Sequence, residues 1–96
     1  MQQAKPFLPN NTVSISATTS SGSIALSGGG HIVRIAATED VYINFGTSGV
    51  TAAVATGMLI LADTPEVFTL KGSVTHVAAI TETGTARVNF TRGEGE

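Results

Sequence analysis

Apolar residues in this chain recur at every second position, in short segments that end at glycine-rich turns. Residues 85–92 show the pattern most clearly, with Ala86, Val88 and Phe90 separated by polar side chains. Successive side chains of a β-strand point to opposite faces, so this alternation predicts a strand with one buried and one exposed face. No segment carries the spacing of an amphipathic helix. The chain is therefore predicted to be an all-β protein.

Segments of this kind occur at intervals of about ten residues. The predicted strands cover residues 12–17, 23–27, 31–37, 40–45, 58–61, 66–70, 75–81 and 85–92. Between Gly46 and Gly57 we predict a long loop, with a short strand inside it as an alternative, because glycines punctuate this stretch and its Val and Thr residues disfavour a helix. About eight short antiparallel strands predict a single-domain β-sandwich, and a jelly roll suits this number of strands.

The N-terminal segment differs from the rest of the chain. Residues 1–11 hold two of the three prolines and show no alternation. Proline lacks a backbone donor and favours extended chain. We therefore predict an extended N-terminal arm, residues 1–11, followed by one β-sandwich domain, residues 12–96, whose last residues, 93–96, form a polar tail. A chain of 96 residues is too short for two ordinary domains.

The composition excludes several classes of protein. Without cysteine the chain has no disulfide, thiolate zinc site or iron–sulfur cluster. Five basic residues and a net charge of −2 argue against nucleic-acid binding, which needs a dense cationic face. Charged residues make up only 12% of the chain, which is low for a small protein that exposes its whole surface to water. This low charge favours a homo-oligomer or larger assembly, in which neighbouring molecules cover part of the surface.

Residues able to carry chemistry are few and have no supporting spacing. His31 and His76 are the only histidines, and each lies on a predicted strand beside a turn. A facing pair could bind a metal, but a structural role is the more common one for such residues. Glu39 and Asp40 match no calcium-loop pattern, and the glycines at 28–30 lack the lysine and helix of a phosphate-binding loop. We therefore predict no catalytic, cofactor-binding or metal-binding residues, and no enzymatic activity.

Aromatic residues are also few. The predicted inward faces hold Phe45, Phe68 and Phe90, which leaves Phe7 and Tyr42 available for binding. A glycan-binding surface usually needs an exposed aromatic ring, and Tyr42 is the best candidate for one.

No segment predicts export or membrane insertion. The first residues lack the apolar region of a secretory signal, and the longest clean apolar run, residues 58–62, is too short to span a bilayer. We therefore expect synthesis in a cytoplasm and no membrane partner.

Several segments resemble small β-rich proteins encoded among the structural genes of tailed bacteriophages and prophages. They are VYINFGTSGVTA at 41–52, EVFTL at 66–70, THVAAITETGTA at 75–86 and TRGEG at 91–95. The resemblance covers about residues 31–95, roughly two thirds of the chain, and its FGTS and ITETGTA turns are unusual together. It implies a virion component, either a capsid decoration (cement) protein or a small head or tail accessory protein, and it brings no catalytic residues.

Composition and resemblance lead to one expectation. The chain is expected to be a structural virion protein, a capsid decoration protein that binds the lattice of the major capsid protein, as a homotrimer. It would be made in the cytoplasm of a bacterial host and end in the virion. The alternative is a small head or tail accessory or binding module on the virion surface, with a glycan as its ligand.

Overall fold

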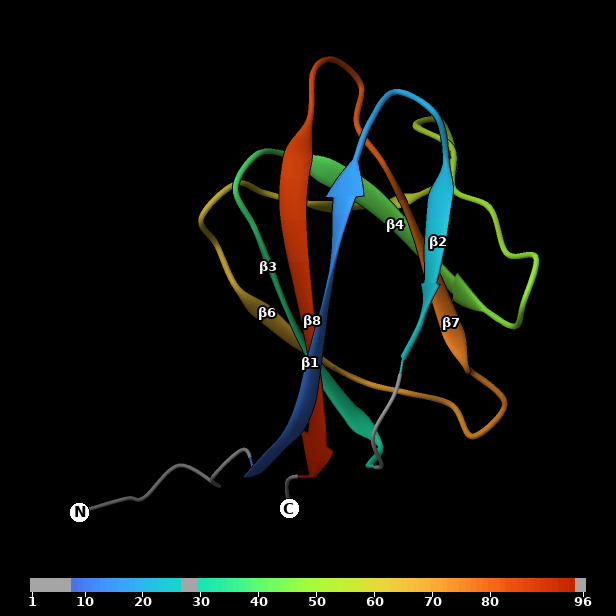
Figure 1. Ribbon diagram of the computed structural model, residues 1–96, viewed down its shortest axis with the longest axis vertical. Coiled ribbons are helices and arrows are strands. Elements are labelled where there is room, and N and C mark those ends of the chain that lie inside the picture. The colour runs from blue at the N-terminus through green and yellow to red at the C-terminus, as the bar shows by residue number, and fades with distance from the viewer. Residues whose placement is uncertain (1–7, 27–29, 95–96) are drawn as a thin grey trace.

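The chain folds into eight β-strands, and the computed structural model describes residues 8–26 and 30–94 (Figure 1). The strands are β1 (Leu8–Ala17), β2 (Gly22–Ala25), β3 (Ile32–Ala37), β4 (Val41–Gly46), β5 (Met58–Ile60), β6 (Glu66–Thr69), β7 (His76–Ile80) and β8 (Ala86–Glu94). The described residues contain no helix. The predicted all-β class and the eight strands are confirmed, and every observed strand overlaps the segment predicted for it.

The strands form two antiparallel sheets of four strands each. Sheet 1 has the order β1-β8-β3-β6, and sheet 2 has the order β2-β7-β4-β5. Figure 1 shows β8 between β1 and β3 in sheet 1. The pairs β1–β8, β2–β7, β3–β6 and β4–β5 are nested within one another along the sequence, as in one long hairpin. Two further pairings, β3–β8 and β4–β7, join these nested pairs into the two sheets.

Inward-facing residues of both sheets build one hydrophobic core. Its buried members are Ala17, Leu26, Val33, Ile35, Ala37, Val41, Ile43, Ile60, Leu70, Val77, Ala79, Ala86, Val88 and Phe90. Most of these residues are the apolar positions of the alternating pattern. Ile60, Val77 and Ala79 are the exceptions, because their strands are almost uniformly apolar and the sequence did not assign them a face. At about 25 cal/mol per Å² of apolar surface removed from water, burial of the core residues is the main contribution that stabilises the fold.

Two aromatic rings link the sheets where β4 and β6 approach each other. Phe45 of sheet 2 and Phe68 of sheet 1 have ring centroids 6.4 Å apart at an interplanar angle of 63°. This is the edge-to-face arrangement that aromatic pairs favour. Both rings are partly buried against the core, as their predicted inward positions require.

Strand β1 begins earlier than predicted. It starts at Leu8 instead of residue 12, so residues 8–11, predicted as part of the arm, pair with β8. Pro9 fits because β1 is an edge strand, where a missing donor costs no hydrogen bond of the sheet. The register shifts between Pro9 and Asn11, which is typical of a β-bulge. The rest of the predicted arm, residues 1–7, lies outside the described residues.

The end of β8 is fastened to the connection between β2 and β3. The Arg92 guanidinium donates to the Gly30 carbonyl from Nε at 3.2 Å and Nη2 at 2.6 Å, and to the Leu26 carbonyl from Nη1 at 3.0 Å. β8 continues to Glu94 because its last residues pair with β1 and β3, so Gly93 and Glu94 belong to the strand instead of the predicted tail. Residues 27–29, which include most of the predicted glycine turn, and residues 95–96 lie outside the described part of the chain.

The segment between β4 and β5 lies along sheet 2, on the side away from the core. Asn44 Nδ2 donates to the Thr51 carbonyl at 3.1 Å, and the Ala52 N–H donates to Ser21 Oγ at 2.8 Å. Ala78 of β7 points away from the core and is nevertheless fully buried, because this segment covers it. We call residues 47–57 the covering loop. It contains turns and no strand, so the loop prediction is confirmed.

Candidate functional site

Three apolar side chains lie side by side on the outer face of sheet 2. Tyr42 of β4 is directly opposite Leu59 of β5 and Ile80 of β7. Residues directly opposite in antiparallel strands point to the same face, with Cβ atoms about 5 Å apart. We call Leu59, Tyr42 and Ile80 the apolar row. Leu59 is 42% exposed, and the other two are half-buried.

Local alternation explains why these side chains point outward. Val41 and Ile43 are buried in the core, so Tyr42 between them must face the other way. Ile60 is fully buried, which directs Leu59 outward, and Ala79 does the same for Ile80. The row is thus a consequence of core packing, but a contiguous apolar patch on an outer face is a common sign of an interaction surface.

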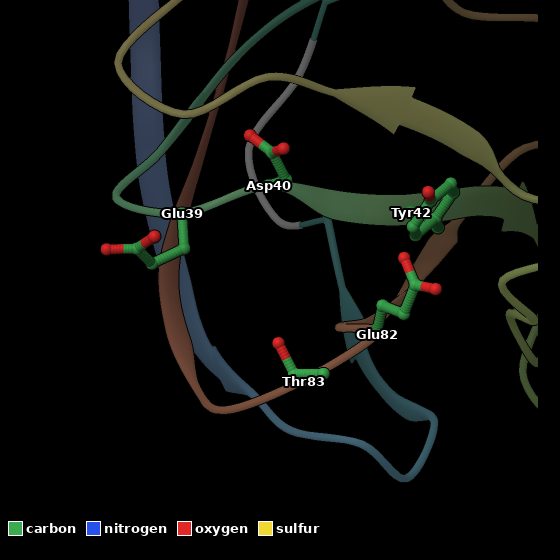
Figure 2. Close-up of a pocket in the computed structure, with 5 residues that line it drawn as sticks. All are labelled: Glu39, Asp40, Tyr42, Glu82 and Thr83. Atoms are coloured by element: carbon green, nitrogen blue, oxygen red, sulfur yellow. The ribbon is translucent and has the colours of Figure 1, made fainter.

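An acidic hollow of about 220 Å³ adjoins the apolar row. It is lined by Glu39, Asp40, Tyr42, Glu82 and Thr83, which come from the β3–β4 connection, β4 and the β7–β8 turn. Figure 2 shows the Glu82 carboxylate directed toward Tyr42, whereas the Glu39 carboxylate points away from it. The hollow therefore combines one aromatic wall with a strongly negative rim.

Asp40 has a structural partner in this hollow. Its Oδ1 accepts a hydrogen bond from the Ala62 N–H at 2.8 Å, which holds the chain that follows β5 against the start of β4. The neighbouring Leu61 is 48% exposed, so it extends the apolar surface toward the hollow. Within residues 8–26 and 30–94, no three His, Asp or Glu side chains are grouped so that they could hold a metal ion.

The outer face of sheet 1 has a different chemistry. Its outward positions are Thr12, Ser14 and Ser16 of β1, Arg87, Asn89 and Thr91 of β8, Ile32, Arg34 and Ala36 of β3, and Val67 and Thr69 of β6. None of these residues is acidic, and two are arginines. Thr12 and Thr91 share a hydrogen bond of 2.9 Å between their hydroxyl oxygens. This face is therefore mostly polar and positively charged.

One apolar residue is prominent on this face. Val67 is 54% exposed and lies directly opposite Arg34. Ile32 is on the same face, two residues before Arg34 in β3. We call Arg34, Val67 and Ile32 the arginine patch. The Arg34 guanidinium makes no hydrogen bond or ion pair with any residue that the structure describes.

A second hollow, of about 260 Å³, lies where β4 continues beyond its pairing with β5. It is lined by Asn44, Phe45, Thr69, Leu70, Lys71 and Val74. β5 pairs only with Val41–Ile43, so the final residues of β4 have no strand on that side. Its polar lining consists of one cation, Lys71, and the neutral side chains of Asn44 and Thr69, and it contains no acid.

The two histidines are placed on different sheets. His31 immediately precedes β3 of sheet 1 and is exposed, and His76 begins β7 of sheet 2. The His76 ring is already engaged, since its Nδ1 lies 2.8 Å from the Thr75 hydroxyl. The structure gives no sign of the facing pair that would bind a metal.

Comparison with known proteins adds no functional information. The chain matches no protein-family profile, no curated protein and no solved structure. In the described part of the chain, no helix has the length and apolarity needed to cross a membrane.

The sequence identified Tyr42 as an available aromatic residue, and the structure places it at the centre of both the apolar row and the acidic hollow. The sequence did not identify its neighbours. Leu59 and Glu82 lie 17 and 40 positions from Tyr42, and only the pairing of β5, β4 and β7 brings them together. Residues 58–61 and 77–80 are uniformly apolar, so the sequence carried no signal that Leu59 and Ile80 face outward.

Proposed function

We propose that the chain is a jelly-roll β-sandwich that acts as a structural component of a tailed-bacteriophage virion. The strand orders support the jelly roll, because rolling up one long nested hairpin of eight strands produces four-stranded sheets with these orders. Viral capsid and lectin domains are among the proteins built in this way. Fold analogy alone does not assign a function, so the argument depends on the surfaces that the fold presents.

The exposed apolar row carries the proposal. Three neighbouring apolar side chains on an outer sheet face lower the solubility of a small protein that has few charged residues. Contact with other molecules covers these side chains and removes them from water. The resemblance of residues 41–52, 66–70, 75–86 and 91–95 to phage structural proteins supports a virion as the place where such contacts form.

Within the virion we assign the chain to the decoration (cement) class, as a homotrimer on the lattice of the major capsid protein. Many copies on a lattice gain avidity from contacts that are weak individually, so a protein of this size can stabilise a head. This role needs a rigid β-unit with adhesive surfaces and requires neither a catalytic group nor a cofactor. The chain would be synthesised in the bacterial cytoplasm and assembled there onto the head.

A pelleting experiment tests this role. Purified protein is mixed with heads of the phage or prophage whose genome encodes it, and the heads are sedimented and then heated in its presence and absence. We expect the protein to pellet with the heads in lattice stoichiometry and to raise the temperature at which they release DNA. A protein that stays in the supernatant, and is missing from purified particles by mass spectrometry, would refute the proposal.

The acidic hollow favours a second candidate function, glycan binding by an accessory module on the virion. Tyr42 supplies an aromatic wall, and the Glu82 carboxylate directed toward it could accept hydrogen bonds from sugar hydroxyls (Figure 2). A glycan array with the wild-type protein tests this candidate. Binding that survives in Tyr42→Phe and is lost in Tyr42→Ala would support stacking on the ring, and an array without any binding would eliminate it.

A further inference from the structure

The two sheets present outer faces of opposite charge. The apolar row on sheet 2 adjoins the hollow lined by Asp40 and Glu82, with Glu39 at its outer rim (Figure 2), and the arginine patch lies on sheet 1, whose outward positions include no acid. We call the apolar row together with the acidic hollow the acidic surface.

Each of these surfaces also exposes large apolar side chains. Met58, Leu59, Leu61 and Val67 are the large hydrophobic residues that the described part of the chain exposes. Leu59 belongs to the acidic surface, Leu61 borders it, and Val67 belongs to the arginine patch. An apolar centre with a polar or charged rim is the usual anatomy of a protein interface, and Tyr and Arg are enriched there.

We propose that the chain associates head to tail with a second copy of itself, the arginine patch of one copy docking on the acidic surface of the next. The Arg34 guanidinium, which has no partner among residues 8–26 and 30–94 of its own chain, would lie against the Tyr42 ring and pair with Glu82 of its neighbour. Arginine is suited to this position, since its planar group both stacks on aromatic rings and binds carboxylates. Val67 would contact the apolar row. The inference depends on the proposed homo-oligomer and names its interface.

Charge also decides against a two-fold arrangement through the acidic surface. A two-fold interface joins the same patch of both subunits, so the carboxylates around Tyr42 would face those of the partner. Like charges brought together at an interface oppose association. The head-to-tail contact joins unlike charges instead, and such a contact produces a ring, for example the proposed trimer, when its rotation closes and an open filament when it does not.

Charge reversal with cross-rescue tests the interface. Arg34→Glu makes the arginine patch negative, and Glu82→Arg gives the acidic surface a positive charge, while each variant keeps its other surface unchanged. We expect each variant alone to associate on the order of 100-fold more weakly than the wild type. In a one-to-one mixture the two reversed surfaces pair with each other and the two unchanged surfaces pair as in the wild type, so we expect association between the variants to recover. Because a ring of three cannot alternate two variants, the recovered species are hetero-dimers and larger alternating assemblies and not the closed trimer. Sedimentation velocity measures both effects, and circular dichroism verifies that the variants are folded.

Matched controls change the same charges elsewhere. Lys71→Glu lies on the connection between β6 and β7, and Glu94→Arg lies at the end of β8, so both should assemble as the wild type does. The proposal is overturned if the wild type is monomeric at its highest soluble concentration, if either test variant assembles normally, or if mixing restores nothing. Head binding is measured separately. If the protein is a monomer that still pellets with heads, the proposed interface is refuted and the proposed head binding stands. If mixing the variants restores association but the protein does not bind heads, the interface stands and the proposed head binding is refuted.

Discussion

Replacing Gly30 with alanine should be among the most damaging single-methyl changes in this protein. Gly30 has a φ of 108°, a conformation that L-residues rarely adopt, and it lies against the backbone of Gly93 in β8. A Cβ at this position would overlap the Gly93 carbonyl oxygen and lie 2.5 Å from its carbonyl carbon. Backbone atoms of a paired strand cannot rotate away as a side chain can, so β3 and β8 would have to separate.

Two contributions set the size of the effect. The positive φ costs about 1–2 kcal/mol for a residue with a Cβ, and relieving an overlap in packed structure typically costs about 1–3 kcal/mol. Together they give roughly 3 kcal/mol, a large part of the 5–15 kcal/mol by which a typical domain is stable. In a domain of this size each kcal/mol lowers the Tm by roughly 4–8 °C. We therefore expect Gly30→Ala to melt roughly 12–24 °C below the wild type.

Two other glycines separate these contributions. Gly49 has a φ of 91° with no atom within 4 Å of an added Cβ, so Gly49→Ala should show only the backbone cost of about 1–2 kcal/mol. Gly72 has open space and no positive φ, so Gly72→Ala should stay within about 0.5 kcal/mol of the wild type. Thermal and urea unfolding followed by circular dichroism measure all three. Equal losses for Gly30→Ala and Gly49→Ala would refute the steric argument at the β3–β8 contact.

Two further predictions concern the covering loop and the chain start. Ser21→Ala removes the hydroxyl that accepts the Ala52 N–H and should lower the free energy of unfolding by about 1 kcal/mol. The control is exposed Ser23, because Ser23→Ala should change the free energy of unfolding by less than about 0.5 kcal/mol. Equal losses in the two variants would show that the Ser21 hydrogen bond does not stabilise the covering loop. Deleting residues 1–7 should weaken head binding and leave the Tm unchanged. Deleting residues 1–11 should also lower the Tm, because residues 8–11 pair with β8. An equal fall of the Tm in both deletions would contradict the assignment of head binding to residues 1–7 and of stability to residues 8–11.

Local signals were sufficient to predict the strands and most of their buried faces. Most strands carry their own alternation, and a residue's face then follows from its neighbours at a spacing of two; β5 and β7, which are almost uniformly apolar, do not. Val88 and Phe90 are buried as the alternation requires, at 0% and 1% exposure. The exceptions also have local causes. Pro9 suggested a segment outside the sheet, but an edge strand with a register shift accommodates a proline without losing a hydrogen bond of the ladder.

The burial of outward-facing residues could not be predicted in the same way. Ala78 alternates with Val77 and Ala79, which places it on the outer face, yet it is 0% exposed because the covering loop lies over it. The bonds that hold this loop, from Asn44 to Thr51 and from Ala52 to Ser21, join residues whose spacing follows no secondary-structure period. A pattern of period two predicts which side of a sheet a residue occupies but not what covers that side.

The same distinction explains the candidate site. Tyr42 was identified as an outward residue from the alternation, whereas Leu59 and Ile80 lie in apolar segments that did not reveal which side faces water. Their grouping depends on the order β7-β4-β5, and the carboxylates join them only because the β3–β4 and β7–β8 connections meet at the same end of the sheet. Arg34 is assigned by alternation in the same way, and it reaches Val67 through the pairing of β3 with β6. The opposite charges of the two outer faces are therefore a property of the topology, and the low overall charge of the chain conceals them.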